Sequence, residues 1–532
     1  MKFTKISVSL QDFKHLTPKK KLKRKTIILF ILRFTKLAFS VVGLSLAAKY
    51  FGVSLDRDMW LIALNGIVVV NLAVWGPINE TFRAKFIILR EEQGEKRVLE
   101  RVRSLLLVTL MITLLLIGCL FAFRYPIARM LAPAYEQEQI AALVLMLLVV
   151  TPSLLFDQFS QLGISILNAY NSFFVPEISN CVAALVNVVS MVLLAPHIGI
   201  YALAVSYYIG LVLMLSLVGY EVYLRKVPVF SGSTKIRLGD FKPFFIYALP
   251  FFIPYFFIQV NFLVEKALGN MLGEGVVSML DYSRKFVDIP INVLTSVLLT
   301  MLVPVLSSRF AKRDPNGFLN DFKQIYQFGF LIITAFIAFL CSSAHELIGV
   351  ILYHKEQMSF EAITKISSLA NYYAWSALIN FFYIIFGLAL LATNKGRIYA
   401  FFGVLAQFIM IGLNLLFYER FGANTFPLSF IVAHSVSAVA LFIYFPYPNR
   451  RLLFGVTSKY LIYLALVVAG SYLTTGLIPG DIADVAVLIV NGCIILVVMF
   501  ALLFILRLEE RLFVVQYWQK ASDVIKKFRS EG

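Results

Sequence analysis

Residues 485–506, VAVLIVNGCIILVVMFALLFIL, contain no charged side chain. An α-helix rises ~1.5 Å per residue, so about 20 apolar residues are enough to cross the ~30 Å hydrocarbon layer of a bilayer. This stretch is long enough and apolar enough to be predicted as a transmembrane helix.

Similar stretches recur along the whole chain of 532 residues. By the same criterion of about 20 apolar residues, the sequence predicts about fourteen transmembrane helices. They are expected near residues 26–50, 59–79, 103–124, 140–166, 173–195, 199–223, 243–268, 275–306, 325–345, 362–392, 397–418, 424–446, 459–478 and 483–506.

The composition agrees with a membrane protein. Hydrophobic residues make up 60% of the chain and the mean hydropathy is +0.83, whereas soluble proteins are only ~45–50% apolar. Phenylalanine is abundant, with 49 residues against 4 tryptophans, and it is well tolerated against lipid. The predicted fold class is an all-α polytopic membrane protein.

The net charge of +18 comes from basic residues that lie between the apolar stretches. They gather in alternate connectors, residues 80–103, 224–242 and 307–324, and in both terminal segments. The opposite side holds only Arg57, Arg124, Arg129, Lys355 and Arg420. The positive-inside rule therefore places both termini in the cytoplasm, and it explains the charge without nucleic acid.

Two connectors recur at a similar offset. Residues 51–59 resemble residues 272–280, and residues 167–172 resemble residues 391–396, each pair a little over two hundred residues apart. Six spans separate the copies, which indicates two parallel six-helix lobes followed by an extra helix pair. The predicted division is a basic N-terminal segment, two lobes, the pair and a cytoplasmic tail, at residues 1–25, 26–224, 242–446, 459–507 and 508–532.

Charged residues at membrane depth are candidates for function, because each costs ~2.5–3.5 kcal/mol to insert at the centre of a helix. Asp281, Arg284 and Asp288 share one face of the eighth span by their i, i+3, i+7 spacing. Arg284 is predicted either to bind an anionic group or to form a stripe of acids and bases that neutralise each other.

The seventh span carries Asn261 and Glu265, four residues apart on one face. A carboxylate and an amide oxygen suit a hard cation, so these two residues are candidate ion ligands. The alternative is that Glu265 pairs with Lys266 or with a neighbouring helix.

Four further residues are candidates for binding an anionic substrate. Arg33 and Lys36 lie on one face of the first span, where they either line a cavity or extend their side chains to the cytoplasmic interface. Glu80 and Arg83 lie at the cytoplasmic end of the second span. Arg83 either attracts a phosphate or is a positive-inside residue.

The sequence lacks the usual marks of an enzyme. The five histidines are scattered without ligand spacing, and there is no phosphate-binding glycine loop or nucleophile elbow. We expect no catalysis, no metal site and no cofactor apart from a coupling ion, Na⁺ or H⁺.

Several short motifs resemble the MurJ (MviN) lipid II flippases of the MOP superfamily. They are INETF at residues 78–82, MLAPAY at 130–135, ILNA at 166–169 and the block at 259–290. The resemblance implies alternating access, in which a V-shaped cationic cavity binds the pyrophosphate of an undecaprenyl-linked glycan. The polyprenyl tail would follow a groove made with spans thirteen and fourteen.

In this resemblance Arg284 matches the functional arginine of span eight, and Asp58 matches an aspartate at the start of span two, so both are expected to contact the substrate. Glu265 stands where the family often has an acid near a proposed sodium site. The expected setting is the bacterial inner membrane, where the protein would act as a monomer on a lipid-linked glycan, most simply the peptidoglycan precursor lipid II.

The sequence departs from the family in span one, where Arg33 and Lys36 are out of register with an arginine pair and Gly43 takes one of the positions. The departure concerns the substrate more than the fold. The alternatives are a flippase for O-antigen or exopolysaccharide precursors, a cation-coupled multidrug exporter of the same superfamily, a membrane glycosyltransferase, or a scaffold.

Overall fold

The computed structural model describes residues 18–225, 227, 237–446, 450–476 and 483–512. Within these ranges the chain is almost entirely helical, and an isolated bridge between His354 and Met358 is the only β-type pairing. The helices are α1 (Pro18–Phe51), α2 (Leu55–Gln93), α3 (Glu95–Ala122), α4 (Arg124–Leu131), α5 (Gln137–Val150), α6 (Ser153–Ala169), α7 (Phe174–Ile198), α8 (Tyr201–Leu224), α9 (Lys242–Met271), α10 (Val276–Ala311), α11 (Pro315–Leu352), α12 (Phe360–Ala392), α13 (Gly396–Phe421), α14 (Thr425–Ile443), α15 (Arg450–Thr475) and α16 (Asp484–Ile505).

The helices confirm the predicted all-α membrane architecture. Thirteen described stretches are long and apolar enough to cross a bilayer. One of them, Gly396–Ile443, contains both α13 and α14, which a short 3₁₀ turn at Gly422–Asn424 separates. With these two helices taken apart, the described residues hold the fourteen spans that the sequence predicts.

The helices differ from the predicted spans in detail. The predicted span at 140–166 is broken into α5 and α6, because Pro152 lacks the amide hydrogen that a continuous helix would need there. The first helix begins at Pro18 rather than near residue 26, and α4 was not predicted. Helix α11 has a kink at Ser343, whose φ of −143° is not helical.

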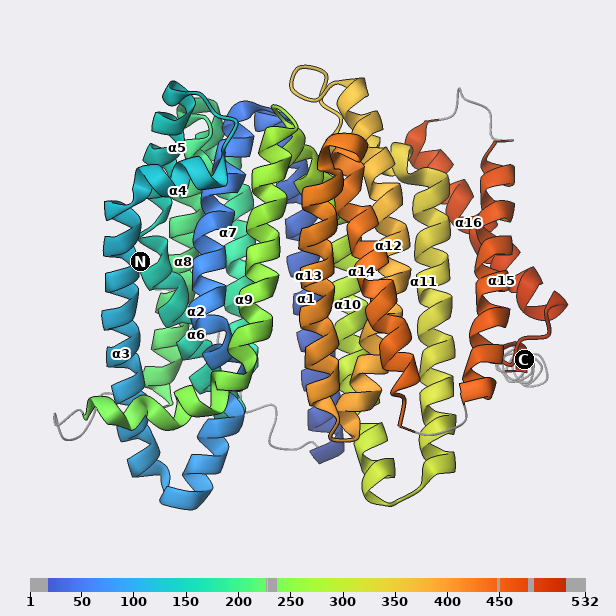
Figure 1. The fold of residues 1–532 in the computed structure, drawn as a ribbon, viewed down its shortest axis with the longest axis horizontal. Helices are drawn as coiled ribbons and strands as arrows, with labels where there is room; N and C mark the ends of the chain where they lie inside the picture. Colours follow the sequence, from blue (N-terminus) through green and yellow to red (C-terminus); the bar gives the residue numbers. More distant parts are fainter. Residues whose placement is uncertain (1–17, 226, 228–236, 447–449, 477–482, 513–532) are drawn as a thin grey trace, which may run out of the picture. The chain divides into compact units, whose positions relative to one another are not determined.

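The chain divides into two compact units, which are described separately. The first unit comprises Met1–Gly52 and Met59–Gln259, and the second comprises Val53–Asp58 and Val260–Gly532. The division falls inside α9, an uninterrupted helix whose residues up to Gln259 belong to the first unit and whose residues from Val260 belong to the second. In each unit the long helices run roughly along one direction (Figure 1).

The first unit is packed around a cluster of aromatic and branched side chains from α2, α3, α6 and α8. Phe82 lies one helical turn from Phe86, and the ring of Phe244 stacks on Phe82 with 5.1 Å between centroids. Offset aromatic pairs add about 0.5–1.5 kcal/mol beyond the area they bury. These rings therefore fix the start of α9 against α2.

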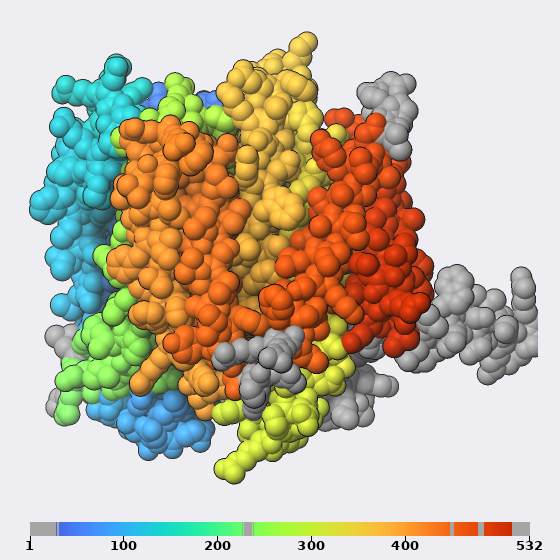
Figure 2. Space-filling view, turned by 45° about the vertical axis from the view of Figure 1, so that its right-hand side comes forward, coloured from blue at the N-terminus to red at the C-terminus, as the bar shows by residue number. Residues whose placement is uncertain are grey.

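The core of the second unit is a column of rings on α11. Phe322, Tyr326 and Phe330 recur every fourth residue, so they lie on one face, and they contact Phe381 and Phe386 of α12. Helices α15 and α16 pack on the same α11 and form an outer part of this unit, coloured red in Figure 2. The added helix pair is therefore held by the second unit's own core.

The internal repeat is visible in the way corresponding helices end. After α6 and after α12, an asparagine adopts left-handed backbone angles, with φ of 57° at Asn171 and 60° at Asn394. Each end has the two hydrogen bonds of a Schellman motif, including Ser172 N–H to Leu167 O and Lys395 N–H to Leu390 O. The motif shifts the predicted register of this repeat by one residue, so that Asn171 corresponds to Asn394.

A second pair of helix ends has the same spacing. Gly199 ends α7 with φ 56° and ψ −137°, and Gly422 ends α13 with φ 55° and ψ −139°. Both this pair and the asparagine pair are 223 residues apart. The two lobes thus repeat the same helix-ending geometry at the same positions.

We predict that Asn394→Val lowers the apparent melting temperature of the detergent-solubilised protein, whereas Asn394→Gly leaves it unchanged or raises it. A β-branched residue in the left-handed region costs about 1–2 kcal/mol, and glycine pays no such cost. Asn394 is exposed, so lost packing does not complicate the comparison. Equal melting temperatures for the two variants would contradict this assignment.

Candidate functional site

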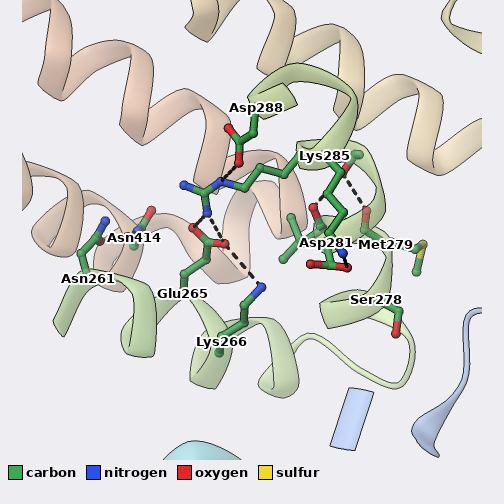
Figure 3. A network of polar contacts seen from close by, with 12 residues as sticks. Asn261, Glu265, Lys266, Ser278, Met279, Asp281, Lys285, Asp288 and Asn414 are labelled. Atoms are coloured by element: carbon green, nitrogen blue, oxygen red, sulfur yellow. Dashed lines mark hydrogen bonds and ion pairs between the residues drawn. The ribbon is translucent and has the colours of Figure 1, made fainter. Parts of the chain in front are cut away.

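A cluster of charged side chains lies in the second unit, where α9 faces the first three turns of α10 (Figure 3). Helix α9 contributes Glu265 and Lys266, and α10 contributes Asp281, Arg284, Lys285 and Asp288. The start of α2, which belongs to this unit, adds Arg57 and Asp58. These eight residues are called the ion cluster below.

Arg284 is held mainly by Glu265. Its Nη1 donates to both carboxylate oxygens of Glu265, at 2.9 and 2.8 Å, and its Nε lies 3.4 Å from Asp288 Oδ2. The guanidinium also lies over the rings of Phe262 and Tyr373, at 5.4 and 6.0 Å from their centroids. The arginine is therefore positioned before any ligand arrives.

The two partners differ in how far they are buried. The Glu265 side chain is 3% exposed, whereas that of Arg284 is 22% exposed and that of Asp288 is 54% exposed. The guanidinium is therefore partly accessible from outside, whereas the Glu265 carboxylate is enclosed.

Asp281 organises the other half of the ion cluster. Lys285 Nζ lies 2.7 Å and Arg57 Nη2 3.5 Å from Asp281 Oδ2. Arg57 is buried and its guanidinium lies 5.4 Å from the ring centre of Tyr282. Arg57, which the sequence analysis counts among the basic residues of the outer side, lies in the first turn of α2 and inside the second unit.

The ion cluster neutralises itself. Its four cations, Arg57, Lys266, Arg284 and Lys285, match four acids, Asp58, Glu265, Asp281 and Asp288. Burying charge is tolerated only when it is paired, so the cluster satisfies this requirement without a ligand. Both alternatives from the sequence are therefore present in one arrangement: a stripe of paired charges, and an arginine whose side chain is partly open.

Asp58 holds the beginning of α10. Its Oδ2 accepts from the backbone N–H of Gly275 at 2.7 Å, and its Oδ1 accepts from the N–H of Ser278 at 2.7 Å and from the Ser278 hydroxyl at 2.5 Å. A carboxylate at this position satisfies amides that have no partner within the helix and interacts favourably with the helix dipole. Asp58 thus acts as an N-cap supplied from another helix, and the substrate contact expected from the resemblance stays a prediction.

The two candidate ion ligands have different partners. Glu265 binds Arg284, whereas the Asn261 side-chain oxygen accepts from Asn414 at 3.5 Å and its nitrogen lies 3.8 Å from the sulfur of Met410. Ser429 donates to Asn414 at 2.5 Å. In this structure Glu265 is thus engaged by Arg284 and Asn261 by a neighbouring amide, and the ion binding expected from the sequence stays a prediction.

Among the described residues, no three histidine, cysteine, aspartate or glutamate side chains are grouped so that they could hold a metal ion.

The remaining predicted residues lie in the first unit. Arg33 forms an ion pair with Glu177 of α7 at 2.8 Å, while Lys36 lies exposed on the same helix. Arg83 contacts Asn171 at 3.4 Å and lies over the ring of Phe173, and Glu80 is exposed. The structure thus brings Asp58, Glu265 and Arg284 into one cluster and Arg33, Lys36, Glu80 and Arg83 into the other unit.

Several contributing residues were missed by the candidate list from the sequence. Arg57 and Lys285 sit beside predicted residues, and the run Asp56-Arg57-Asp58 next to a span is a local signal for the first. Tyr373 and Asn414 give no such signal, because their partners are more than eighty residues away along the chain. Such pairs are found only once the helices are packed.

The chain is similar in sequence to known proteins. The family model described as "Lipid II flippase MurJ" matches residues 47–505. A protein described as "Probable lipid II flippase MurJ" from Aquifex aeolicus (strain VF5) is 26% identical over 452 residues, which cover 82% of this chain and 86% of that protein.

Two solved structures have similar folds. One, "Lipid II flippase MurJ, inward closed conformation", has a TM-score of 0.77 at 18% identity and covers 90% of this chain and 99% of the other. The other is a multidrug resistance MATE family transporter of the MOP superfamily in an inward-facing conformation. It has a TM-score of 0.65 at 11% identity and covers 81% of this chain and 99% of the other.

We predict that Asp58→Ala lowers the free energy of unfolding by about 1–2 kcal/mol, because α10 loses its cap and buried amides lose their acceptor. The measurement is the apparent melting temperature in detergent. Asp56→Ala is the matched control, since Asp56 lies in the same helical turn but is exposed. If both variants melt at the same temperature, Asp58 does not hold α10.

Proposed function

Because this chain belongs to the MurJ lipid II flippase family, we propose that it moves lipid II from the cytoplasmic to the outer leaflet of the bacterial inner membrane. The chain is a multi-pass membrane protein, and the match to the family covers residues 47–505. The relative from Aquifex aeolicus supports this substrate, since the aligned region extends over most of both chains.

Arg284 is the observation that carries the proposal at the level of residues. A guanidinium binds carboxylates and phosphates alike, so a phosphate oxygen can take the place of the Glu265 carboxylate at Nη1. We infer that the pyrophosphate of the lipid replaces Glu265 as the partner of Arg284. Lys285, the next residue of α10, has a side chain that is 41% exposed and supplies a second cation.

The exchange of partners explains why a self-neutral cluster is useful for transport. A permanently free arginine at membrane depth would be costly, and a fully enclosed ion pair would not respond to a substrate. Here the resting partner is on the same protein, so the pyrophosphate has to compete with Glu265. Competition keeps the affinity moderate, which allows the lipid to leave after it has crossed.

The setting of the protein follows from the same proposal. The basic residues in alternate connectors place both termini in the cytoplasm. Moving a lipid between leaflets breaks no covalent bond, so the proposed activity requires no catalytic group and no nucleic acid. Each unit has its own core, which is consistent with a protein that works as a monomer.

We predict that the double variant Arg284→Gln, Glu265→Gln inserts at the wild-type level but fails to rescue a bacterium depleted of its own lipid II flippase. The double change removes one positive and one negative charge together, and two glutamine amides can still hydrogen-bond. The net charge of the ion cluster stays zero, although Lys266 and Asp288 each lose an ion-pair partner, so a loss of rescue is attributed to the missing Arg284–Glu265 pair only at equal insertion.

The control for this experiment is the double variant Glu361→Gln, Lys365→Gln, which removes an exposed ion pair of α12 and should rescue fully. Rescue by the Arg284→Gln, Glu265→Gln variant at equal expression would exclude Arg284 from substrate binding. Failure of the wild type to rescue, despite insertion, would contradict lipid II as the substrate.

The coupling ion expected from the sequence is a separate prediction. Since Glu265 is already engaged by Arg284 and Asn261 by Asn414, we expect lipid II movement in proteoliposomes to proceed equally fast in sodium and in potassium buffers of the same pH. A rate that falls when sodium is withdrawn would show that Na⁺ is bound elsewhere or in another conformation.

A further inference from the structure

A polar cavity lies in the second unit, remote in sequence from the ion cluster. It is open to the outside and is lined by Lys323 and Gln327 of α11, the first turns of α15 and the residues that follow α16, and it has a volume of about 330 Å³. This size is within the ~300–1,000 Å³ typical of small-molecule sites. Its polar lining includes Lys323, Lys459, Tyr460, Arg507 and Glu509.

The charges of this cavity are not balanced. Lys323 forms an ion pair with Glu509, whose other oxygen accepts from Gln327 at 3.5 Å. The hydrogen bond from Lys323 lowers the pKa of the Glu509 carboxyl below its ordinary value, so the acid stays ionised and engaged. Neither Lys459 nor Arg507 forms a hydrogen bond or ion pair with a described residue, although the charge of Lys459 also acts on the Glu509 carboxyl, so two further cations line the cavity beside one paired acid.

Arg507 occupies its position at a conformational cost. It follows α16 with a φ of 50°, and the bonds from Arg507 N–H to Phe504 O and from Leu508 N–H to Leu503 O form a Schellman motif. Glycine is the usual residue there, because a residue with a Cβ carries a penalty of about 1 kcal/mol in the left-handed backbone conformation. The arginine side chain, unlike glycine, contributes a cation to the wall of the cavity.

The cavity lies at the depth of lipid headgroups. Helix α16 has 22 apolar-rich residues, which span roughly 33 Å at 1.5 Å per residue, about the thickness of the hydrocarbon layer. Arg507 comes two residues after it ends, and therefore lies at the interface. Close by, Ile505 and Phe454 are exposed large apolar side chains, with 70% and 66% of their surface accessible. Acyl chains can cover such a surface.

We propose that this cavity binds the phosphodiester group of an anionic phospholipid, whose acyl chains lie along α15 and α16. Lys459 and Arg507 donate to the phosphate oxygens, and the apolar side chains of Leu452, Val456 and Leu508 contact the glycerol and the first methylene groups. The site extends beyond the flippase function, because it recognises a bulk lipid of the membrane and not the transported one.

Gly455 offers a way to close the cavity without altering its charges. It lines the cavity from α15, and a Cβ built on it meets no atom within 4 Å. Leucine at this position therefore projects into open space and also favours the helix over glycine. Gly455→Leu should fill the site while the helix stays intact.

The test is a binding titration of the purified full-length protein in detergent, followed by native mass spectrometry. The probes are phosphatidylglycerol, phosphatidylcholine and inorganic phosphate. We expect phosphatidylglycerol to bind at least about tenfold more tightly than phosphatidylcholine, since its phosphate is not neutralised by an attached cation. Gly455→Leu and the double variant Lys459→Gln, Arg507→Gln should each weaken phosphatidylglycerol binding by about tenfold or more.

Lys395→Gln is the matched control, because Lys395 is an exposed lysine on the same predicted side of the membrane but outside the cavity. It should bind phosphatidylglycerol like the wild type. Equal binding by the wild type and both cavity variants would overturn the proposal. Competition by inorganic phosphate as effective as that by phosphatidylglycerol would overturn the lipid assignment and identify a soluble phosphate ligand. Rescue of lipid II transport is not the readout, so this proposal and the proposed function fail separately.

Discussion

The ion pair between Arg284 and Glu265 is the interaction on which the proposed mechanism depends (Figure 3). A charge at membrane depth needs a partner, and the strength of this pairing in a poorly hydrated setting fixes the guanidinium to one place. The surrounding structure also holds the guanidinium in place. Asp58 caps α10, so that Arg284 and Asp281 project from a helix with a defined beginning. The rings of Phe262 and Tyr373 limit where the guanidinium can move.

The same physical constraint explains the two cationic sites of the second unit. In the ion cluster every cation has an acid, and binding an anion requires an exchange of partners. In the cavity beside Arg507, only Lys323 has an acid, and two cations remain for a ligand. A transported anion must be released, whereas a structural lipid is retained. Paired charges suit the release of a transported anion, and unpaired cations suit the retention of a structural lipid.

Much of the fold could be predicted from the sequence because its cause is local. Apolar length sets the spans. The repeat could also be seen, although the one-residue register appeared only in the left-handed backbone of Asn171 and Asn394. The break at Pro152 could be expected from the chemistry of proline, but whether a proline breaks or merely bends a helix depends on packing. Pro77 and Pro290, for example, lie inside continuous helices.

The candidate site could be predicted only in part. Charge at membrane depth was enough to single out Arg284 and Glu265, the resemblance added Asp58, and the structure places all three in one cluster. The partners were not predictable, because Arg57 meets Asp281 from a position 224 residues earlier in the chain. Likewise, the cavity beside Arg507 depends on three segments that only packing brings together.

The central claim is that the pyrophosphate replaces Glu265 as the partner of Arg284, and infrared difference spectroscopy tests it most directly. Spectra of the purified protein would be recorded before and after saturation with lipid II, for the wild type and for Glu265→Gln. The account predicts a shift of one carboxylate stretching band in the wild type that is missing from Glu265→Gln. Saturable binding of lipid II without any change in that band would show that Glu265 keeps its arginine, and would contradict the exchange.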